Sequence, residues 1–137
     1  MWLRLVALSA VAAVLQSVPS PRELRQGDES NIDSARQVVV RTQAEWETLW
    51  REHSPDTARP QVDFRTDMVL ALFLGSRPTP GYAVNIASVT NVGDGLIVRY
   101  RETKPPPGSV SIQVLTFPYH MVLISQRAGR ITFDLVN

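Results

Sequence analysis

The feature that most constrains the fold is a run of seven apolar residues at positions 68–74, Met-Val-Leu-Ala-Leu-Phe-Leu. Successive side chains of a β-strand point to opposite faces of its sheet. A run of strand length without a polar member is therefore typical of a central strand that is covered on both faces. Any fold for this chain must supply a layer of apolar side chains on each side of that strand.

Later segments show the alternation of apolar and polar residues that is typical of half-buried strands. It occurs in residues 82–86, 96–100 and 110–114, and Gly93-Asp94-Gly95 between the first two is a hairpin signal. Three further strands are predicted around residues 38–40, 121–124 and 131–135. Short connections leave no room for crossover helices, which favours antiparallel pairing. The predicted fold class is α+β, mainly antiparallel β, with six or seven strands in a sandwich or a single curved sheet.

One helix is predicted before the apolar run. Thr42 and Glu45 form the capping-box pattern, in which each side chain accepts a hydrogen bond from the other's backbone N–H. The residues that follow place an apolar face at i, i+3, i+4 and i+7, and Pro55 ends the helix. Large aromatic residues usually supply core area, so we expect this N-terminal helix to lie across the sheet. The face consists of Trp46, Leu49, Trp50 and His53.

The first 20 residues have the order of a secretory signal peptide: a positive charge, an apolar stretch and then small residues. We expect cleavage between residues 16 and 20, and a secreted or periplasmic protein without stable membrane insertion. The chain has no cysteine, so a lipid-attachment cysteine is absent. Residues 21–36 are polar and are predicted to be a flexible lead-in. The single β-rich domain is predicted over residues 37–137.

The sequence contains no recognisable catalytic motif. It has two histidines, His53 and His120, and neither a Gly-x-Ser-x-Gly elbow nor a His-Glu-x-x-His pair. No group of residues has metal-ligand spacing, and the phosphate-cradling glycine patterns are absent. A formal net charge of +1 gives no basic stripe for nucleic acid. We therefore expect a protein that is not an enzyme, needs no cofactor or metal, and binds another protein.

Three loops are candidates for that contact. Residues 75–82 are stiffened by two prolines and contain Gly81, which can adopt a positive φ. Residues 104–108 contain three consecutive prolines and act either as an exposed polyproline II ligand or as a stiff connector. In residues 116–120, Pro118 predicts a bulge, a strand boundary or an edge. The candidate contact residues are Arg77, Pro78, Thr79, Pro80, Gly81, Tyr82, Pro118, Tyr119 and His120.

Each candidate has a structural alternative. The pattern is equally consistent with Tyr82 as a turn residue that points into the core and with Tyr82 as a contact residue. Arg77 and Thr79 are the first candidates for contact with a partner. His120 shares a parity with Val122 and Ile124, which favours an interior, hydrogen-bonded role. If the three loops meet at one end of the sheets, they can form one binding surface. If they are scattered, they are turns that maintain the fold.

The order and spacing of these segments resemble a known family. The stretch from Phe73 to Ile86, then Pro105-Pro106-Pro107-Gly108, then residues 116–122, is similar to the C-terminal domain of the protease complex subunit PrcB family. The resemblance covers residues 69–133. It implies a non-catalytic subunit that associates with a secreted or cell-surface serine protease, and it supplies no catalytic residues.

Two other functions remain open from the sequence. Residues 77–82 are similar to the Asn-Pro-Thr-Thr-Gly-Tyr loop of chagasin-type cysteine-protease inhibitors, with Arg77 and Pro80 as departures. That likeness implies a protease inhibitor that uses this loop. A small-molecule or glycan site would instead need a concave surface lined by Tyr82, Tyr100 or Tyr119.

Overall fold

The computed structural model describes residues 20–137, in which it places seven strands and one helix. The predicted signal peptide lies outside the described residues, except for Ser20. Within residues 20–137, no helix combines the length and apolar character needed to cross a membrane. The elements are β1 (Arg22–Gly27), β2 (Ala35–Val40), α1 (Gln43–His53), β3 (Asp67–Leu74), β4 (Ala83–Val92), β5 (Gly95–Thr103), β6 (Tyr119–Ser125) and β7 (Ile131–Leu135).

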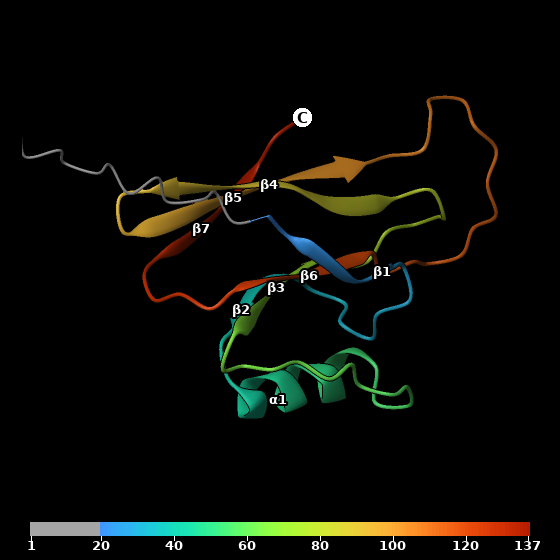
Figure 1. The fold of residues 1–137 in the computed structure, drawn as a ribbon. Helices are drawn as coiled ribbons and strands as arrows, with labels where there is room; N and C mark the ends of the chain where they lie inside the picture. The colour runs from blue at the N-terminus through green and yellow to red at the C-terminus, as the bar shows by residue number, and fades with distance from the viewer. Residues whose placement is uncertain (1–19) are drawn as a thin grey trace, which may run out of the picture.

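The elements form three layers (Figure 1). The larger sheet has the strand order β1-β6-β3-β2, and the smaller sheet has the order β4-β5-β7. Helix α1 covers one face of the larger sheet, and the smaller sheet covers the other face. This arrangement confirms the predicted fold class. Of the two predicted forms, a sandwich and a single curved sheet, the structure has the two stacked sheets of a sandwich.

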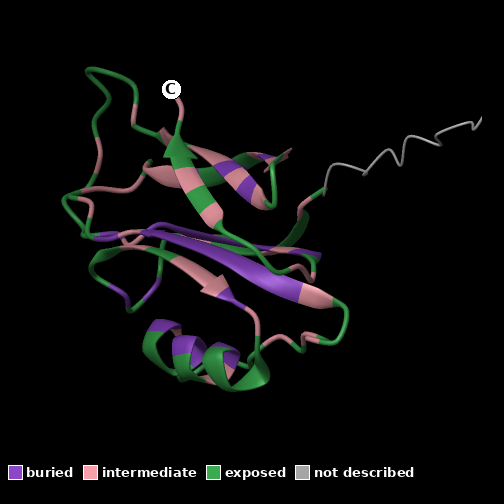
Figure 2. Cartoon of the chain, turned by 90° about the vertical axis from the view of Figure 1, so that its left-hand side faces the viewer, coloured by how far each residue is buried: buried purple, intermediate pink, exposed green. Residues whose placement is uncertain are grey.

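Strand β3 lies at the centre of this arrangement. It pairs antiparallel with β6 on one side and with β2 on the other. Val69, Ala71 and Phe73 face the helix, whereas the alternate residues Met68, Leu70 and Leu72 face the smaller sheet. All six are buried, as predicted for an apolar run covered on both faces (Figure 2).

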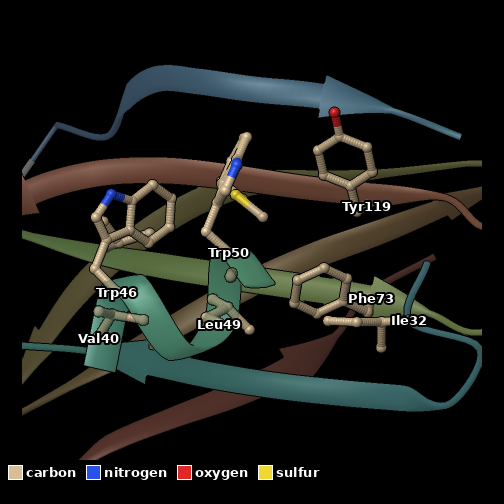
Figure 3. Packing of buried hydrophobic residues seen from close by; sticks show 10 residues of the cluster. Ile32, Val40, Trp46, Leu49, Trp50, Phe73 and Tyr119 are labelled. Atoms are coloured by element: carbon tan, nitrogen blue, oxygen red, sulfur yellow. The ribbon is translucent and has the colours of Figure 1, made fainter. Parts of the chain in front are cut away.

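The helix-side core is rich in aromatic residues (Figure 3). Thr42 caps α1: its Oγ1 accepts from the backbone N–H of Glu45 at 3.2 Å and donates to the carboxylate of Glu45 at 2.9 Å. The predicted apolar face is buried against β3 and β6. The indole N–H groups of Trp46 and Trp50 donate to the carbonyls of Pro60 and Thr57 at 2.9 and 3.0 Å, so the burial leaves neither donor unpaired.

The prediction of a flexible lead-in over residues 21–36 is wrong. β1 pairs antiparallel with β6, and Ile32 and Leu24 pack in the helix-side core. The polar composition of this segment reflects an edge strand whose side chains face solvent while its backbone completes a sheet. Amino-acid composition alone gives no indication of that backbone pairing.

In the smaller sheet, one prediction from the sequence is confirmed and another is corrected. Gly93 and Asp94 connect β4 and β5 in the predicted hairpin, with Gly93 at φ +57°. The predicted strand over residues 110–114 does not form, because these residues belong to the connection that crosses from β5 in one sheet to β6 in the other. β7 crosses back and pairs parallel with β5, so the pairing is mainly but not wholly antiparallel.

Buried His53 makes the fold sensitive to acid. Its Nδ1 lies 2.8 Å from the Ser30 hydroxyl, which also accepts from the backbone N–H of Ile32. A neutral imidazole can accept the Ser30 hydrogen at Nδ1, whereas a charged ring can only donate. Burial lowers the pKa of His53 from 6.5 to about 4, although the charge of Glu29 acts in the opposite direction.

We predict that the protein loses stability between pH 6.5 and pH 4. The unfolded chain binds a proton in this window that the folded chain excludes, so the free energy of unfolding falls as the pH drops, by up to about 3 kcal/mol. Urea unfolding at about pH 7 and about pH 4.5 measures the loss. His53→Gln should be less stable near neutral pH but should lose less on acidification. Equal losses in the two proteins would contradict the prediction.

Candidate functional site

The three predicted loops meet at one end of the two sheets (Figure 1). Arg77 and Thr116 form an antiparallel bridge, with N–H···O distances of 2.8 and 2.9 Å. The Thr116 hydroxyl donates to the carbonyl of Thr79 at 3.0 Å. The connection from β3 to β4 is therefore held against the segment that leads into β6.

The proline-rich segment packs on the same loop. Gly81 has φ +98°, and a Cβ added there would lie 3.0 Å from Cγ of Pro105. Gly81 is thus required both by its backbone conformation and by this close approach. Between the two loops is an open groove of about 390 Å³, lined chiefly by Pro80, Gly81, Lys104, Pro105, Pro106 and Val110.

Arg77 is held by internal partners. Its Nε donates to Oε1 of Glu102 on β5 at 2.8 Å, and its Nη1 donates to the carbonyls of Leu74 and Ser76, each at 3.0 Å. The two side chains are only 25% and 15% exposed. Its guanidinium carbon lies 6.0 Å from the centre of the Tyr82 ring. Arg77 therefore ties the β3–β4 loop to the smaller sheet.

The third loop contributes to the interior. Pro118 marks the boundary before β6, as predicted, and its carbonyl accepts from Leu74 N–H at 3.0 Å. Tyr119 and His120 are each 4% exposed. The Tyr119 hydroxyl donates to Glu29 at 2.9 Å, and burial together with this bond raises its pKa to about 12.

His120 connects three strands. Its Nδ1 accepts from the backbone N–H of Ile86 on β4 at 2.9 Å, and its Nε2 lies 2.8 Å from the carboxylate of Glu23 on β1. The first bond places the ring hydrogen on Nε2, where it is donated to Glu23. This is the interior, hydrogen-bonded role that its parity favours.

Among the remaining candidates, Pro78 and Gly81 are exposed, whereas Thr79, Pro80 and Tyr82 are half-buried. The tyrosines do not share one concave site. Tyr119 packs in the helix-side core, and Tyr100 packs against the inter-sheet core between the two sheets.

Sequence reasoning missed the most exposed apolar residues of this end. We call residues 110–115 the loop-end patch: Val110 is fully exposed, Ile112 and Leu115 are 68% and 62% exposed, and Val114 is half exposed. The alternating pattern was visible but was assigned to a strand. The prolines and glycine just before it, which break regular pairing, were the signal that it lies in a loop.

The polar groups of the described residues bear on whether this protein could hold a metal site or a nucleophile–base pair. In the part of the chain that the structure describes, no group of three or more His, Asp or Glu side chains could hold a metal ion. The Ser30–His53 pair superficially resembles a nucleophile and its base, but both residues are buried. The exposed features are apolar side chains beside a groove stiffened by proline.

Comparison with known proteins finds one family model that matches part of the chain. Residues 68–125, from β3 to β6, match the family model described as PrcB C-terminal. No curated protein and no solved structure gives a significant match. The matched range includes all three loops and the loop-end patch.

We predict that Arg77 and Glu102 stabilise the fold as a coupled pair. Arg77→Met leaves a mostly buried carboxylate unpaired, so the free energy of unfolding should fall by about 1–3 kcal/mol. Adding Glu102→Gln should cost less than the sum of the single changes, with a coupling of about 1–2 kcal/mol in urea unfolding.

The more exposed Arg59–Glu47 pair is the matched control for this cycle. Arg59→Met with Glu47→Gln should give a coupling below about 1 kcal/mol. Strict additivity at Arg77 and Glu102 would show that their ion pair does not hold the loop.

Proposed function

We propose that this chain, whose residues 68–125 match the PrcB C-terminal family model, is an exported, non-catalytic subunit that binds a secreted or cell-surface protease. The family fits an accessory role in a protease complex. The N-terminal sequence supports export, since residues 1–20 have the order of a signal peptide.

The loop-end patch carries this proposal. Ile112, Leu115 and their apolar neighbours are exposed on one connection, beside the groove that contains Pro105 and Gly81. A contiguous exposed apolar patch is a common mark of a protein-binding surface. Figure 2 shows the long connection between β5 and β6 largely in the colour of exposed residues.

The rest of this end supplies a rigid base for contact. Arg77 and Thr116 hold the β3–β4 loop in place, and Pro105 packs against Gly81. A surface that is ordered before binding loses less conformational entropy when a partner arrives. Of the residues predicted to touch the partner, Pro78 and Gly81 are exposed, and Gly81 lines the same groove as Val110, whereas Tyr119 and His120 are buried.

The state of the two histidines supports the non-catalytic part of this proposal. His53 is buried, and its low pKa keeps it neutral beside Ser30. His120 has both ring nitrogens engaged, one with Ile86 and one with Glu23. A general base must be within hydrogen-bond reach of a bound substrate, and neither histidine is open to one.

The inhibitor alternative has weaker support. It assigns residues 77–82 to a protease cleft, but Arg77 is directed at Glu102 and only Pro78 and Gly81 of the loop are exposed. It predicts inhibition of papain-like proteases that Thr79→Ala weakens.

The proposal is tested by affinity capture with the full chain as bait. We predict that Ile112→Asp with Leu115→Asp lowers recovery of a protease about tenfold or more, because charges replace apolar contacts at the centre of the patch. Val92→Asp is the matched control, since Val92 is 53% exposed but lies in the hairpin that connects β4 and β5. Mass spectrometry and peptidase activity of the captured fraction measure the result.

Thermal unfolding of each variant checks that the fold is intact. If no protease is recovered with the unaltered chain, or if Val92→Asp reduces recovery as much as the patch variant, the proposal is wrong. Inhibition of a papain-like protease by the unaltered chain would favour the alternative.

A further inference from the structure

Strand β2 is an edge of the larger sheet: it pairs with β3 on one side, and no strand within residues 20–137 pairs with its other side. Its pairing with β3 runs from Ala35 to Val40 without a register shift. Outside this ladder, no backbone hydrogen bond among residues 20–137 involves residues 35–40. Every second residue of an antiparallel strand directs its N–H and C=O away from its partner. β2 therefore presents a regular row of free backbone donors and acceptors.

The opposite side of the sandwich is closed. The edge strands there, β1 and β4, are each interrupted by a register shift, and bulges of this kind hinder the addition of another strand. Gln26 of β1 also donates to the carbonyl of Val84 on β4 at 2.9 Å, and His120 bonds to both strands. β2 has no bulge, and its side-chain hydrogen bond to the smaller sheet, from Gln37 to Tyr100, leaves the backbone of its outer edge unpaired.

A groove runs between β2 and the helix. Its volume is about 370 Å³, and its lining includes Val38 of β2 with Leu49 and Thr48 of α1. The charges in it are not balanced: Arg36 pairs with Glu52 at 2.5 Å, whereas Glu45 forms no salt bridge within residues 20–137.

A second groove of about 380 Å³ lies on the other face of β2, toward the smaller sheet. It begins beside Gln37, whose side-chain amide donates to the Tyr100 hydroxyl at 3.2 Å. The apolar part of its lining comes from Leu72, Leu74, Tyr100 and Leu135. The free edge of β2 thus lies between two grooves, one on each face of the sheet.

We propose that β2 is the docking edge for an extended segment of a partner polypeptide, which adds a strand to the larger sheet. Backbone hydrogen bonds to residues 35–40 hold such a segment, and its side chains alternate between the two grooves. Both grooves have apolar lining, so the segment carries apolar residues on both faces. Glu45 selects a lysine or arginine at a position that faces the helix.

This surface shares no residue with the loop-end patch, so it is a second and independent contact. A partner could lose contact with the patch and still add a strand to β2. The two proposals can therefore fail separately.

The test is a titration of the full, 15N-labelled chain with the peptide acetyl-Thr-Val-Lys-Ile-Val-Val-Thr-amide. Backbone amide shifts should change along residues 35–40. Methylation of alternate peptide nitrogens on the pairing edge should weaken binding about tenfold or more, because it removes the donors that pair with β2. Glu45→Gln keeps the capping hydrogen bond but removes the charge, and should weaken binding roughly two- to fivefold.

Glu47→Gln is the matched control, since it makes the same change on the same helix at a residue that lines neither groove. It should bind like the unaltered chain, as should Ile112→Asp. Absence of binding at about 1 mM peptide, equal binding of the methylated peptide, or shifts centred on β7 would overturn the proposal. A dimer of this chain paired through residues 35–40, which the peptide dissociates, would also overturn it by making a second copy the occupant.

Discussion

The structure depends on the burial of both faces of β3. Val69, Ala71 and Phe73 need the helix layer, and Met68, Leu70 and Leu72 need the smaller sheet, so neither layer is optional. Each buried side chain of this size contributes roughly 1.5–3 kcal/mol relative to exposure, apart from the smaller alanine. The chain has no disulfide to add to this, because it contains no cysteine. The order of layers, helix on sheet on sheet, follows from this one strand.

A small number of polar contacts then fix how the layers sit on one another. His120 reaches from β6 to both β1 and β4, and Arg77 reaches from the β3–β4 loop to Glu102 on β5. The contacts of His120 with Ile86 and of Arg77 with Glu102 reach the smaller sheet, where apolar packing alone does not specify alignment. Buried polar groups that are fully hydrogen-bonded restrict the core to one arrangement. The loop end is therefore held firmly where it meets the sheets, and its exposed large apolar side chains lie on the β5–β6 connection.

Sequence reasoning succeeded where the signal is local and failed where it depends on distant partners. The cap at Thr42, the apolar face of α1 and the hairpin at Gly93 were predictable because each is set by residues within one or two turns of chain. The pairing of β1 with β6 was not, since a polar edge strand is defined by a backbone partner about a hundred residues away. For the site, the sequence identified the loops but assigned Arg77 to the surface, because nothing near it in the chain indicates that Glu102 lies beside it. The apolar pattern of residues 110–115 was recognised, but such a pattern does not show whether the segment pairs with another strand.

The pairing of β1 with β6 also has a consequence for how the chain acquires its fold. Along the chain, β1 comes about a hundred residues before the strand with which it pairs, Tyr119–Ser125. Contacts between such distant segments form late and slow the folding of a domain, because a long loop must close before they gain any stability. Strand β3 also lacks one of its two neighbours in the sheet until β6 has been synthesised. The larger sheet therefore cannot be completed until β6 has been synthesised, about a hundred residues after β1.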